Sequence, residues 1–238
     1  MKTEGRNAVT ELLKTDKTVD KILMEAGAEG SLGRIFAMAR KKNIRVQFVS
    51  RAALDRESEA KRHQGVIAFT TDFVYSDLYD LVGKEESLIV LCDGIEDVHN
   101  LGSILRVAEC AGADGVIIPS VRGATVNEAV VRISAGAAEH IKVVKVGSLD
   151  HAIEELQKLG YWVYALEAGG ENIYDETFSG KVALVVGGED SGVRRLTKEK
   201  CDKTLSIPLF GKVNSLNASV ALGIGVYEVV RARLKKPD

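Results

Sequence analysis

Glycines and polar residues follow two apolar runs near the C-terminus of this 238-residue chain, and they are the clearest candidates for chemistry. The first run, VALVV, ends at Gly187 and Gly188, and Glu189 follows at once. The second segment, SIPLFGKVNSLNASVALGIGVYEVV, reads as a strand ending at 207–209, a polar loop, and a long helix capped by Ser215. Two glycine-bearing strand ends so close in sequence predict a pocket lined by backbone groups.

Two common nucleotide-binding patterns are excluded. None of the Gly-Lys pairs at 83–84, 180–181 and 211–212 is followed by Ser or Thr, as a P-loop requires. The run GGEDSG does not match GxGxxG, and Gly223 and Gly225 lie inside the expected final helix. ATP and NAD are therefore disfavoured. S-adenosylmethionine fits better, because backbone groups can hold its adenine and ribose while apolar side chains sandwich the ring.

Asn100 and Arg106 lie six residues apart in DGIEDVHNLGSILRVAECAGADGVIIP, which begins at Asp93. With Asn100 as the cap of a helix over 101–110, Arg106 lies nearly two turns into that helix, at the margin of its apolar stripe. An arginine there can project beyond the helix toward a ligand, or it can be a surface salt-bridge partner. The spacing leaves both interpretations open.

Together these three segments resemble, in order, the three motifs of the SpoU/TrmH family of RNA ribose 2′-O-methyltransferases in the SPOUT superfamily. The resemblance runs from about residue 88 to the C-terminus. EGRNAVTELL and HQGVIA extend it to two-domain members of the RlmB type, which modify guanosine in large-subunit ribosomal RNA. It implies a C-terminal parallel-sheet domain with a trefoil knot, a small N-terminal α/β domain that binds the RNA substrate, a homodimer, and S-adenosylmethionine as cofactor.

The resemblance also implies roles for individual residues. The cofactor-binding positions are Gly187, Ile207 and Leu216, and the catalytic positions are Asn100, Arg106, Glu189, Ser215 and Asn217. Ordinary core packing explains Ile207 and Leu216 equally well. Gly187 is stronger, since close backbone approach to a ligand is one of the few reasons to leave a strand end without a side chain.

Two places depart from the family pattern. Asp97-Val98-His99 stands where many members have Asp-Pro, which changes the expected shape of that loop. Asp190-Ser191 follows the second-motif glutamate, where others often carry glycine or other residues. We attach no loss of function to either.

Methyl transfer from a sulfonium is an in-line displacement, so the protein must position the ribose hydroxyl and relieve it of a proton. Arginine, with a pKa above ~12, is an awkward base. A neighbouring RNA phosphate could relay the proton, or the guanidinium could stabilise developing negative charge. The sequence leaves both open.

Strands and helices alternate from residue 87 onward, in the part expected to be the methyltransferase domain, 87–238. The expected strands are 88–93, 115–118, 142–146, 162–167, 182–186 and 206–209, and the expected helices are 101–110, 127–137, 150–159 and 215–234. Near-continuous apolar strands between amphipathic helices indicate an α/β fold with a parallel sheet covered on both faces.

The first 72 residues are expected to form the smaller α/β domain, followed by a linker over 73–86. Expected there are helices over 5–14, over 31–42 with Ser31 as cap, and after Ser50, and strands over 19–24, 44–49 and 66–70. Residues 1–71 hold 14 Lys and Arg against 9 Asp and Glu, giving +5, against −7 for the remainder. This asymmetry favours the N-terminal domain as the RNA dock, although a solvated surface explains any single charge equally well.

The composition argues against a disordered, fibrous or membrane-spanning protein. A hydrophobic content of 45% is typical of a globular core, and no apolar run approaches the ~18 residues of a membrane span. The first residues lack an apolar signal core, so a cytoplasmic protein is expected. Three scattered cysteines and four scattered histidines, without CxxC or Cys/His clusters, predict reduced core cysteines and no metal site.

We therefore predict a cytoplasmic, S-adenosylmethionine-dependent RNA 2′-O-methyltransferase that acts on ribosomal RNA as a homodimer. The alternatives are a tRNA 2′-O-methyltransferase and a non-catalytic RNA-binding or ribosome-assembly protein of the same fold. A dehydrogenase is a more distant third.

Overall fold

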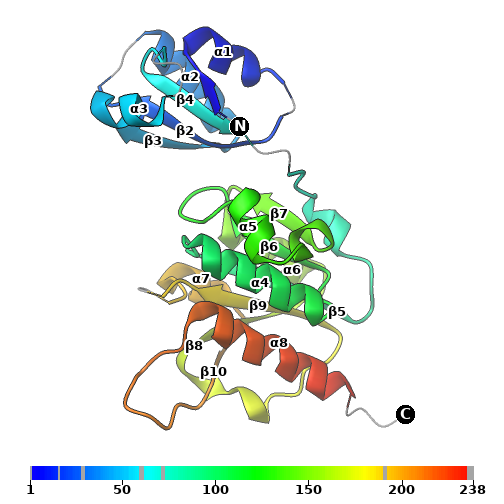
Figure 1. Cartoon of the computed structure of the whole chain (residues 1–238). Coiled ribbons are helices and arrows are strands. Elements are labelled where there is room, and N and C mark those ends of the chain that lie inside the picture. The colour runs from blue at the N-terminus through cyan, green and yellow to red at the C-terminus, as the bar shows by residue number, and fades with distance from the viewer. Residues whose placement is uncertain are drawn as a thin grey trace. The chain divides into compact units, whose positions relative to one another are not determined.

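The computed structural model describes residues 2–15, 17–27, 30–58, 62–70, 73–189 and 192–234, in two compact units divided between Val74 and Tyr75. Each unit has its own sheet and core (Figure 1). The boundary expected after residue 72 stays a prediction, and residues 71 and 72 lie outside the described residues.

The N-terminal unit is a four-stranded mixed sheet of order β1-β4-β2-β3. Its elements are β1 (Lys2–Glu4), α1 (Arg6–Leu12), β2 (Val19–Glu25), α2 (Ser31–Lys41), β3 (Arg45–Val49), α3 (Arg51–Glu57) and β4 (Val66–Thr70). Apolar residues of α1 and α2 pack on one face of this sheet, with Val9, Ile22 and Ile35 fully or almost fully buried. The alternation of helices and strands is as expected, apart from β1, which is too short to show a periodic pattern.

The C-terminal unit is a six-stranded, wholly parallel sheet of order β10-β8-β9-β5-β6-β7. Its elements are β5 (Ser87–Asp93), α4 (Val98–Cys110), β6 (Gly115–Pro119), α5 (Glu128–Ile133), β7 (Lys142–Val146), α6 (Leu149–Lys158), β8 (Trp162–Asn172), β9 (Lys181–Gly187), α7 (Arg195–Lys200), β10 (Lys203–Ser206) and α8 (Ala218–Leu234). Short 3₁₀ helices span Leu78–Leu81, Ala137–Glu139 and Ile173–Asp175. The expected doubly covered parallel sheet is confirmed.

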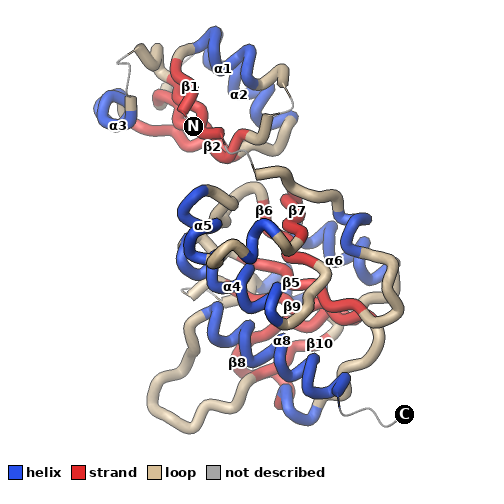
Figure 2. Tube along the Cα trace, turned by 45° about the vertical axis from the view of Figure 1, so that its right-hand side comes forward, coloured by secondary structure: helices blue, strands red, loops and turns tan. Residues whose placement is uncertain are grey.

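Helices α4 and α8 lie side by side on one face of this sheet, and α6 covers the other (Figures 1 and 2). Gly225 of α8 lets the helix approach the sheet closely, because a Cβ there would lie 2.6 Å from Leu166 Cδ1. Gly102 of α4 does the same toward α5, where a Cβ would lie 2.6 Å from Ile133 Cγ2. These two glycines therefore serve packing within the chain.

Several expected element ends are wrong, each for a local reason. Helix α4 begins at Val98, not at 101, because Asp97 Oδ1 accepts the backbone N–H groups of His99 at 2.8 Å and Asn100 at 2.9 Å. Asn100 is therefore inside the first turn and is not the cap. The side chain of Ser31 does not cap α2, which begins after Gly30, and Ser50 is the N-cap residue of α3 without a side-chain cap bond.

The strand and helix of the last segment are also shifted. Strand β10 ends at Ser206, before Pro208, which has no N–H to donate to a ladder. Helix α8 begins at Ala218, and Asn217 takes the capping role expected of Ser215. The short helix α7 was not expected, because six residues carry too little periodicity to be recognised.

Candidate functional site

Three polar side chains from distant parts of the chain meet at the carboxyl edge of the C-terminal sheet. Asn100 Nδ2 donates to Glu189 Oε1 at 3.0 Å, and Asn217 Nδ2 donates to Asn100 Oδ1 at 2.9 Å and also to Glu189 Oε1. We call Asn100, Glu189 and Asn217 the polar triad. It joins the first turn of α4, the turn after β9 and the start of α8. Three of the five expected catalytic residues are thus in direct contact.

Asn217 has two functions in this arrangement. Its Oδ1 accepts the N–H groups of Ser219 at 3.0 Å and Val220 at 3.3 Å, and so caps α8. Because Oδ1 is used by the helix, Nδ2 must face Asn100 and Glu189. The capping bond therefore fixes which end of the amide enters the polar triad.

Two buried or partly buried carboxylates hold the turn that carries Glu189. Asp93, only 1% exposed at the end of β5, accepts the backbone N–H of Arg194 at 2.9 Å and pairs with its Nε at 2.5 Å. Glu167 Oε2 accepts the N–H of Val193 at 2.7 Å. These contacts tie the far end of the turn to strands β5 and β8, so Glu189 is held opposite Asn100.

The sequence analysis did not predict that Asp93, Glu167 and Arg194 belong to the site. Each is separated from its partner by at least 26 residues, and a lone acid at a strand end is not a recognisable signal. Only the place of Asp93, as the last residue of the expected strand 88–93, indicated this edge of the sheet.

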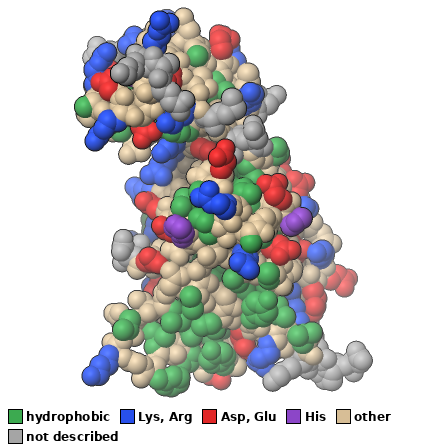
Figure 3. Space-filling model, in the orientation of Figure 1, with side chains coloured by type: hydrophobic (Ala, Val, Ile, Leu, Met, Phe, Trp, Pro, Cys, Tyr) green, Lys and Arg blue, Asp and Glu red, His purple; other side chains and the backbone are tan. Residues whose placement is uncertain are grey.

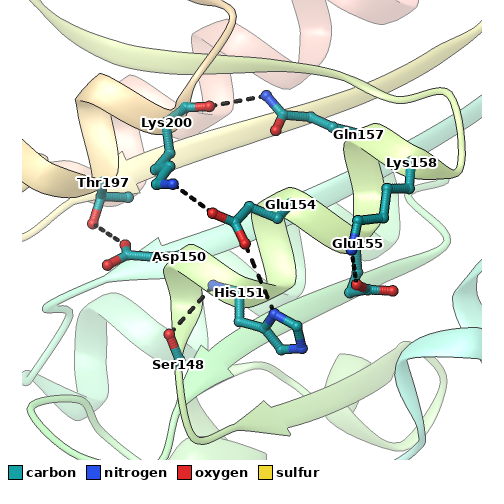
Figure 4. Close-up of polar contacts among 9 residues, drawn as sticks. All are labelled: Ser148, Asp150, His151, Glu154, Glu155, Gln157, Lys158, Thr197 and Lys200. Atoms are coloured by element: carbon teal, nitrogen blue, oxygen red, sulfur yellow. Dashed lines mark hydrogen bonds and ion pairs between the residues drawn. The ribbon is translucent and has the colours of Figure 1, made fainter.

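Helix α7 anchors the same turn from its other side by docking on α6, as Figure 4 shows. Thr197, fully buried, donates to Asp150 Oδ1 at 3.2 Å, and Gln157 Nε2 donates to the backbone oxygen of Lys200 at 2.9 Å. The Lys200 ammonium, hydrogen-bonded to Glu154 at 2.5 Å, holds the pKa of that carboxyl below its ordinary value. Helix α7 thereby links the end of the turn to α6.

A cavity of about 470 Å³ opens beside the polar triad. All three expected cofactor positions, Gly187, Ile207 and Leu216, line it, together with the expected catalytic residues Glu189 and Ser215. Its remaining lining residues are Leu166, Glu167, Ala168, Val186, Gly188, Gly192, Leu205, Leu209, Asn214, Ala218 and Ala221. Apolar side chains and glycine backbone thus both line this cavity, a combination that suits a purine nucleoside.

Packing within the chain also requires a glycine at position 187, whose expected contact with the cofactor stays a prediction. A Cβ at Gly187 would lie 1.9 Å from the backbone carbon of Gly192 and 2.1 Å from the nitrogen of Val193. The turn that carries Glu189 therefore folds directly over Gly187, and the glycine is needed for contact between two stretches of the protein's own backbone.

Arg106 lies outside both the polar triad and the cavity lining. It is exposed on α4, and within the described part of the chain its guanidinium makes no hydrogen bond or ion pair. The surface salt bridge that the sequence left open as its role is therefore not formed with any described residue. The arginine is available to an external anion.

No helix in the described ranges is both long and apolar enough to cross a membrane. Within the same ranges, no group of three or more His, Cys, Asp or Glu side chains is placed to hold a metal ion.

Comparison with known proteins decides the family. Residues 87–227 match the SpoU rRNA Methylase family, and residues 3–76 match the family described as RNA 2'-O ribose methyltransferase substrate binding. The chain belongs to the SpoU methylase family. The expected family, and the expected fold of a parallel-sheet domain preceded by a substrate-binding domain, are confirmed.

Two relatives and one solved structure match nearly the whole chain, and a second solved structure matches about two thirds of it. A putative TrmH family tRNA/rRNA methyltransferase of Staphylococcus saprophyticus is 41% identical over 96% of this chain and 94% of its own length. The protein called YacO of Bacillus subtilis, given the same description, is 40% identical with the same coverage. The SpoU methyltransferase AviRb of Streptomyces viridochromogenes, solved with AdoMet, has a TM-score of 0.65 at 24% identity, over 99% of this chain and 91% of that one. The A. aeolicus TrmH/SpoU tRNA modifying enzyme has a TM-score of 0.58 at 28% identity, over 66% of this chain and 81% of that one.

Proposed function

We propose that this protein transfers a methyl group from S-adenosylmethionine to a ribose 2′-hydroxyl of RNA, with a guanosine of large-subunit ribosomal RNA as the target. The observation that carries the proposal is the polar triad at the rim of a cavity lined by Gly187, Ile207 and Leu216. Membership of the SpoU methylase family and the AdoMet-bound structure of AviRb support it.

The residues of the cavity fit S-adenosylmethionine. Ile207, Leu209 and Leu216 can contact the adenine ring, and the backbone of Gly187 and Gly188 can hydrogen-bond its edge and the ribose. The bound cofactor supplies an electrophilic methyl group. The chain's own residues must then bring a ribose hydroxyl in line with it.

In this proposal the polar triad and Arg106 act on the ribose. Asn100, Glu189 and Asn217 are hydrogen-bonded to one another, and Ser215 lines the same cavity as Glu189. Arg106 stabilises negative charge that develops on the 2′-oxygen, or it holds an RNA phosphate that relays the proton. Both roles need an unpaired guanidinium, which is what the described residues provide.

The substrate assignment rests on the N-terminal unit. Its +5 charge suits contact with phosphates, and its match to a substrate-binding family suits a role in RNA selection. The relatives' descriptions name tRNA and rRNA together, so tRNA is the second candidate. A cytoplasmic location follows from either substrate, and the trefoil knot expected of the fold belongs to this proposal too.

Methyl incorporation tests the proposed function. Ribosomal RNA and tRNA from cells that lack the protein are incubated separately with the purified full chain and labelled S-adenosylmethionine. We expect label in large-subunit ribosomal RNA, on a 2′-oxygen. Label confined to tRNA would show that tRNA, not ribosomal RNA, is the substrate. No label in any RNA would favour the non-catalytic alternative.

The exposed side of α8 supports a homodimer through the C-terminal unit. Val220, half-buried Ile224 and Tyr227 recur at helical spacing along one stripe, and Val220 and Tyr227 are about half exposed. Arg231, paired with Glu228, follows one turn later on the same side, and Leu234 beyond it is 81% exposed. Figure 3 shows hydrophobic side chains gathered over this helix. Gly225 lies on the other side of α8 and packs against Leu166 inside the chain, so it is not available to a partner. The apolar stripe is therefore the basis of this inference.

We expect the protein to sediment as a dimer at micromolar concentration and Tyr227→Arg to sediment as a monomer, since a charge in the apolar stripe must be desolvated on association. Tyr79→Arg is the matched control, because Tyr79 is 62% exposed on a 3₁₀ helix beside Glu155, which can pair with the new charge. A monomeric unsubstituted protein would rule out the dimer. An equal effect of both variants would place the interface elsewhere.

A further inference from the structure

The turn that follows β6 holds an arginine in an unfavourable backbone conformation. Arg122 has a φ of 58°, in the left-handed region that residues other than glycine adopt only at a cost in free energy. Such a conformation persists where the surroundings impose it, and it is frequent at ligand-binding sites.

The surroundings of Arg122 impose that conformation from both sides. The N–H of Ser120 donates to Val146 O at 2.8 Å before the turn, and the N–H of Ala124 donates to Ile95 O at 2.7 Å after it. Between them Gly123 lies so close to Pro119 that a Cβ would be 2.9 Å from its Cγ. The backbone of Arg122 is therefore fixed, and its side chain leaves the protein at a defined point.

The turn of Arg122 lies at the same edge of the C-terminal sheet as the polar triad. Ile95, which accepts the hydrogen bond from Ala124, is in the loop between β5 and α4. The same loop ends at Asp97, the cap of α4, and Asn100 follows in the first helical turn. The turn of Arg122 is thus bonded directly to the loop that positions Asn100.

The guanidinium of Arg122 is exposed, and none of the described side chains or backbone groups forms a hydrogen bond or ion pair with it. A ribose in RNA has a phosphodiester on each side, so a ribose placed at the polar triad brings phosphates to the surrounding surface. A guanidinium binds a phosphate with two parallel hydrogen bonds, which fixes orientation as well as adding affinity.

We propose that Arg122 binds a backbone phosphate of the RNA next to the nucleotide whose ribose is methylated. The proposal rests on the proposed function and adds a substrate-binding residue to the C-terminal unit. It predicts a contact that is independent of base identity and sensitive to salt.

Binding of an unmodified transcript of large-subunit ribosomal RNA tests the proposal, with S-adenosylhomocysteine present so that no transfer occurs. We expect Arg122→Ala to weaken binding about 5- to 10-fold at ~0.15 M salt and to lower the slope of log affinity against log salt by about 0.7 to 1. Arg122→Lys should keep the slope and part of the affinity, because it keeps the charge but loses the bidentate geometry. Calorimetric affinity for S-adenosylhomocysteine reports whether the cavity is intact.

Two further variants test whether weaker RNA binding is caused by loss of the guanidinium, by the backbone conformation or by a change in net charge. Arg122→Gly relieves the backbone and should bind as weakly as Arg122→Ala, and if it instead restores affinity, the backbone is responsible and the proposal fails. Arg195→Ala removes an arginine that is already paired with Glu199 at 2.8 Å, and it should bind as the unsubstituted protein does. An equal fall in salt slope for this control would mean a bulk charge effect and would also overturn the proposal.

The outcomes also separate this proposal from the proposed function. If the unsubstituted protein binds RNA but transfers no methyl group, the proposed function fails while the role of Arg122 in binding is still measured. If it transfers methyl groups and Arg122→Ala keeps the same affinity and salt slope, only the role of Arg122 is wrong.

Discussion

Replacing Arg106 by alanine is expected to lower the single-turnover rate of methyl transfer by about 10²-fold or more, with RNA saturating. The guanidinium is exposed on α4 and has no partner among the described residues, so it can face the ribose or its phosphate. Affinity for S-adenosylmethionine should be nearly unchanged, because Arg106 is outside the cavity lining. Rapid-quench measurement of labelled methyl transfer gives the rate, and calorimetry gives the affinity.

Arg106→Lys distinguishes the two roles proposed for the guanidinium. Lysine keeps the charge but lacks the planar fork that can hold a hydroxyl and a phosphate together, so we expect it to be almost as slow as alanine. Recovery of most of the rate would mean that only a positive field is needed. Arg195→Ala is the matched control and should keep the full rate, since that side chain is paired on the surface of α7.

A defect that disappears at higher RNA concentration would contradict the catalytic assignment. It would make Arg106 a docking residue, comparable to the role proposed for Arg122.

Gly187→Ala is expected to remove cofactor binding almost completely and to lower the melting temperature. The new Cβ would meet only backbone atoms, at 1.9 Å from Gly192 C and 2.1 Å from Val193 N, so the turn over it must move. Overpacking of this kind typically costs about 1–3 kcal/mol of folding free energy. The shift also separates Glu189 from Asn100, so we expect at least about a 10²-fold loss of S-adenosylmethionine affinity, measured by calorimetry alongside thermal unfolding.

Gly211→Ala is the control for this substitution. Gly211 lies in the loop between β10 and α8, near residues that line the same cavity, and a Cβ there meets nothing within 4 Å. We expect both the melting temperature and the cofactor affinity of this variant to match the unsubstituted protein. Unsubstituted values for Gly187→Ala would show that the turn can move freely and would remove the structural argument for this glycine.

Local signals in the sequence determined the elements and the chemical types of the site. The apolar runs that became β5, β7 and β9 needed only their composition, and β7 was expected at its observed bounds. Asn100, Glu189, Ser215 and Asn217 were named from the resemblance of three segments to the motifs of the SpoU/TrmH family, and the structure brings all four to one cavity or its rim. Arg106 was placed at the margin of its helix by helical spacing, and it is exposed there.

Contacts between distant segments were decided only by the tertiary structure. Asp93 meets Arg194 across 101 residues and Glu167 meets Val193 across 26, because the strand order places β5 and β8 on either side of β9. Hydrophobic periodicity reports on a window of one or two turns and carries no information about which strands become neighbours. The support for the turn of Glu189 was therefore invisible in the sequence.

Two site residues also make contacts within the chain that the sequence did not reveal. Asn217 was predicted as a site residue but not as the cap of α8, and Gly187 was predicted to let a ligand approach but not to be needed for backbone contact with Gly192. Arg122 shows no signal at all in the sequence, because its left-handed conformation is imposed by hydrogen bonds to Val146 and Ile95 on either side. The sequence by itself determined which residue types stand at the ends of which strands. Only the packing of those ends against one another decided which atoms meet, because such contacts depend on the order of strands in the sheet and not on their order in the chain.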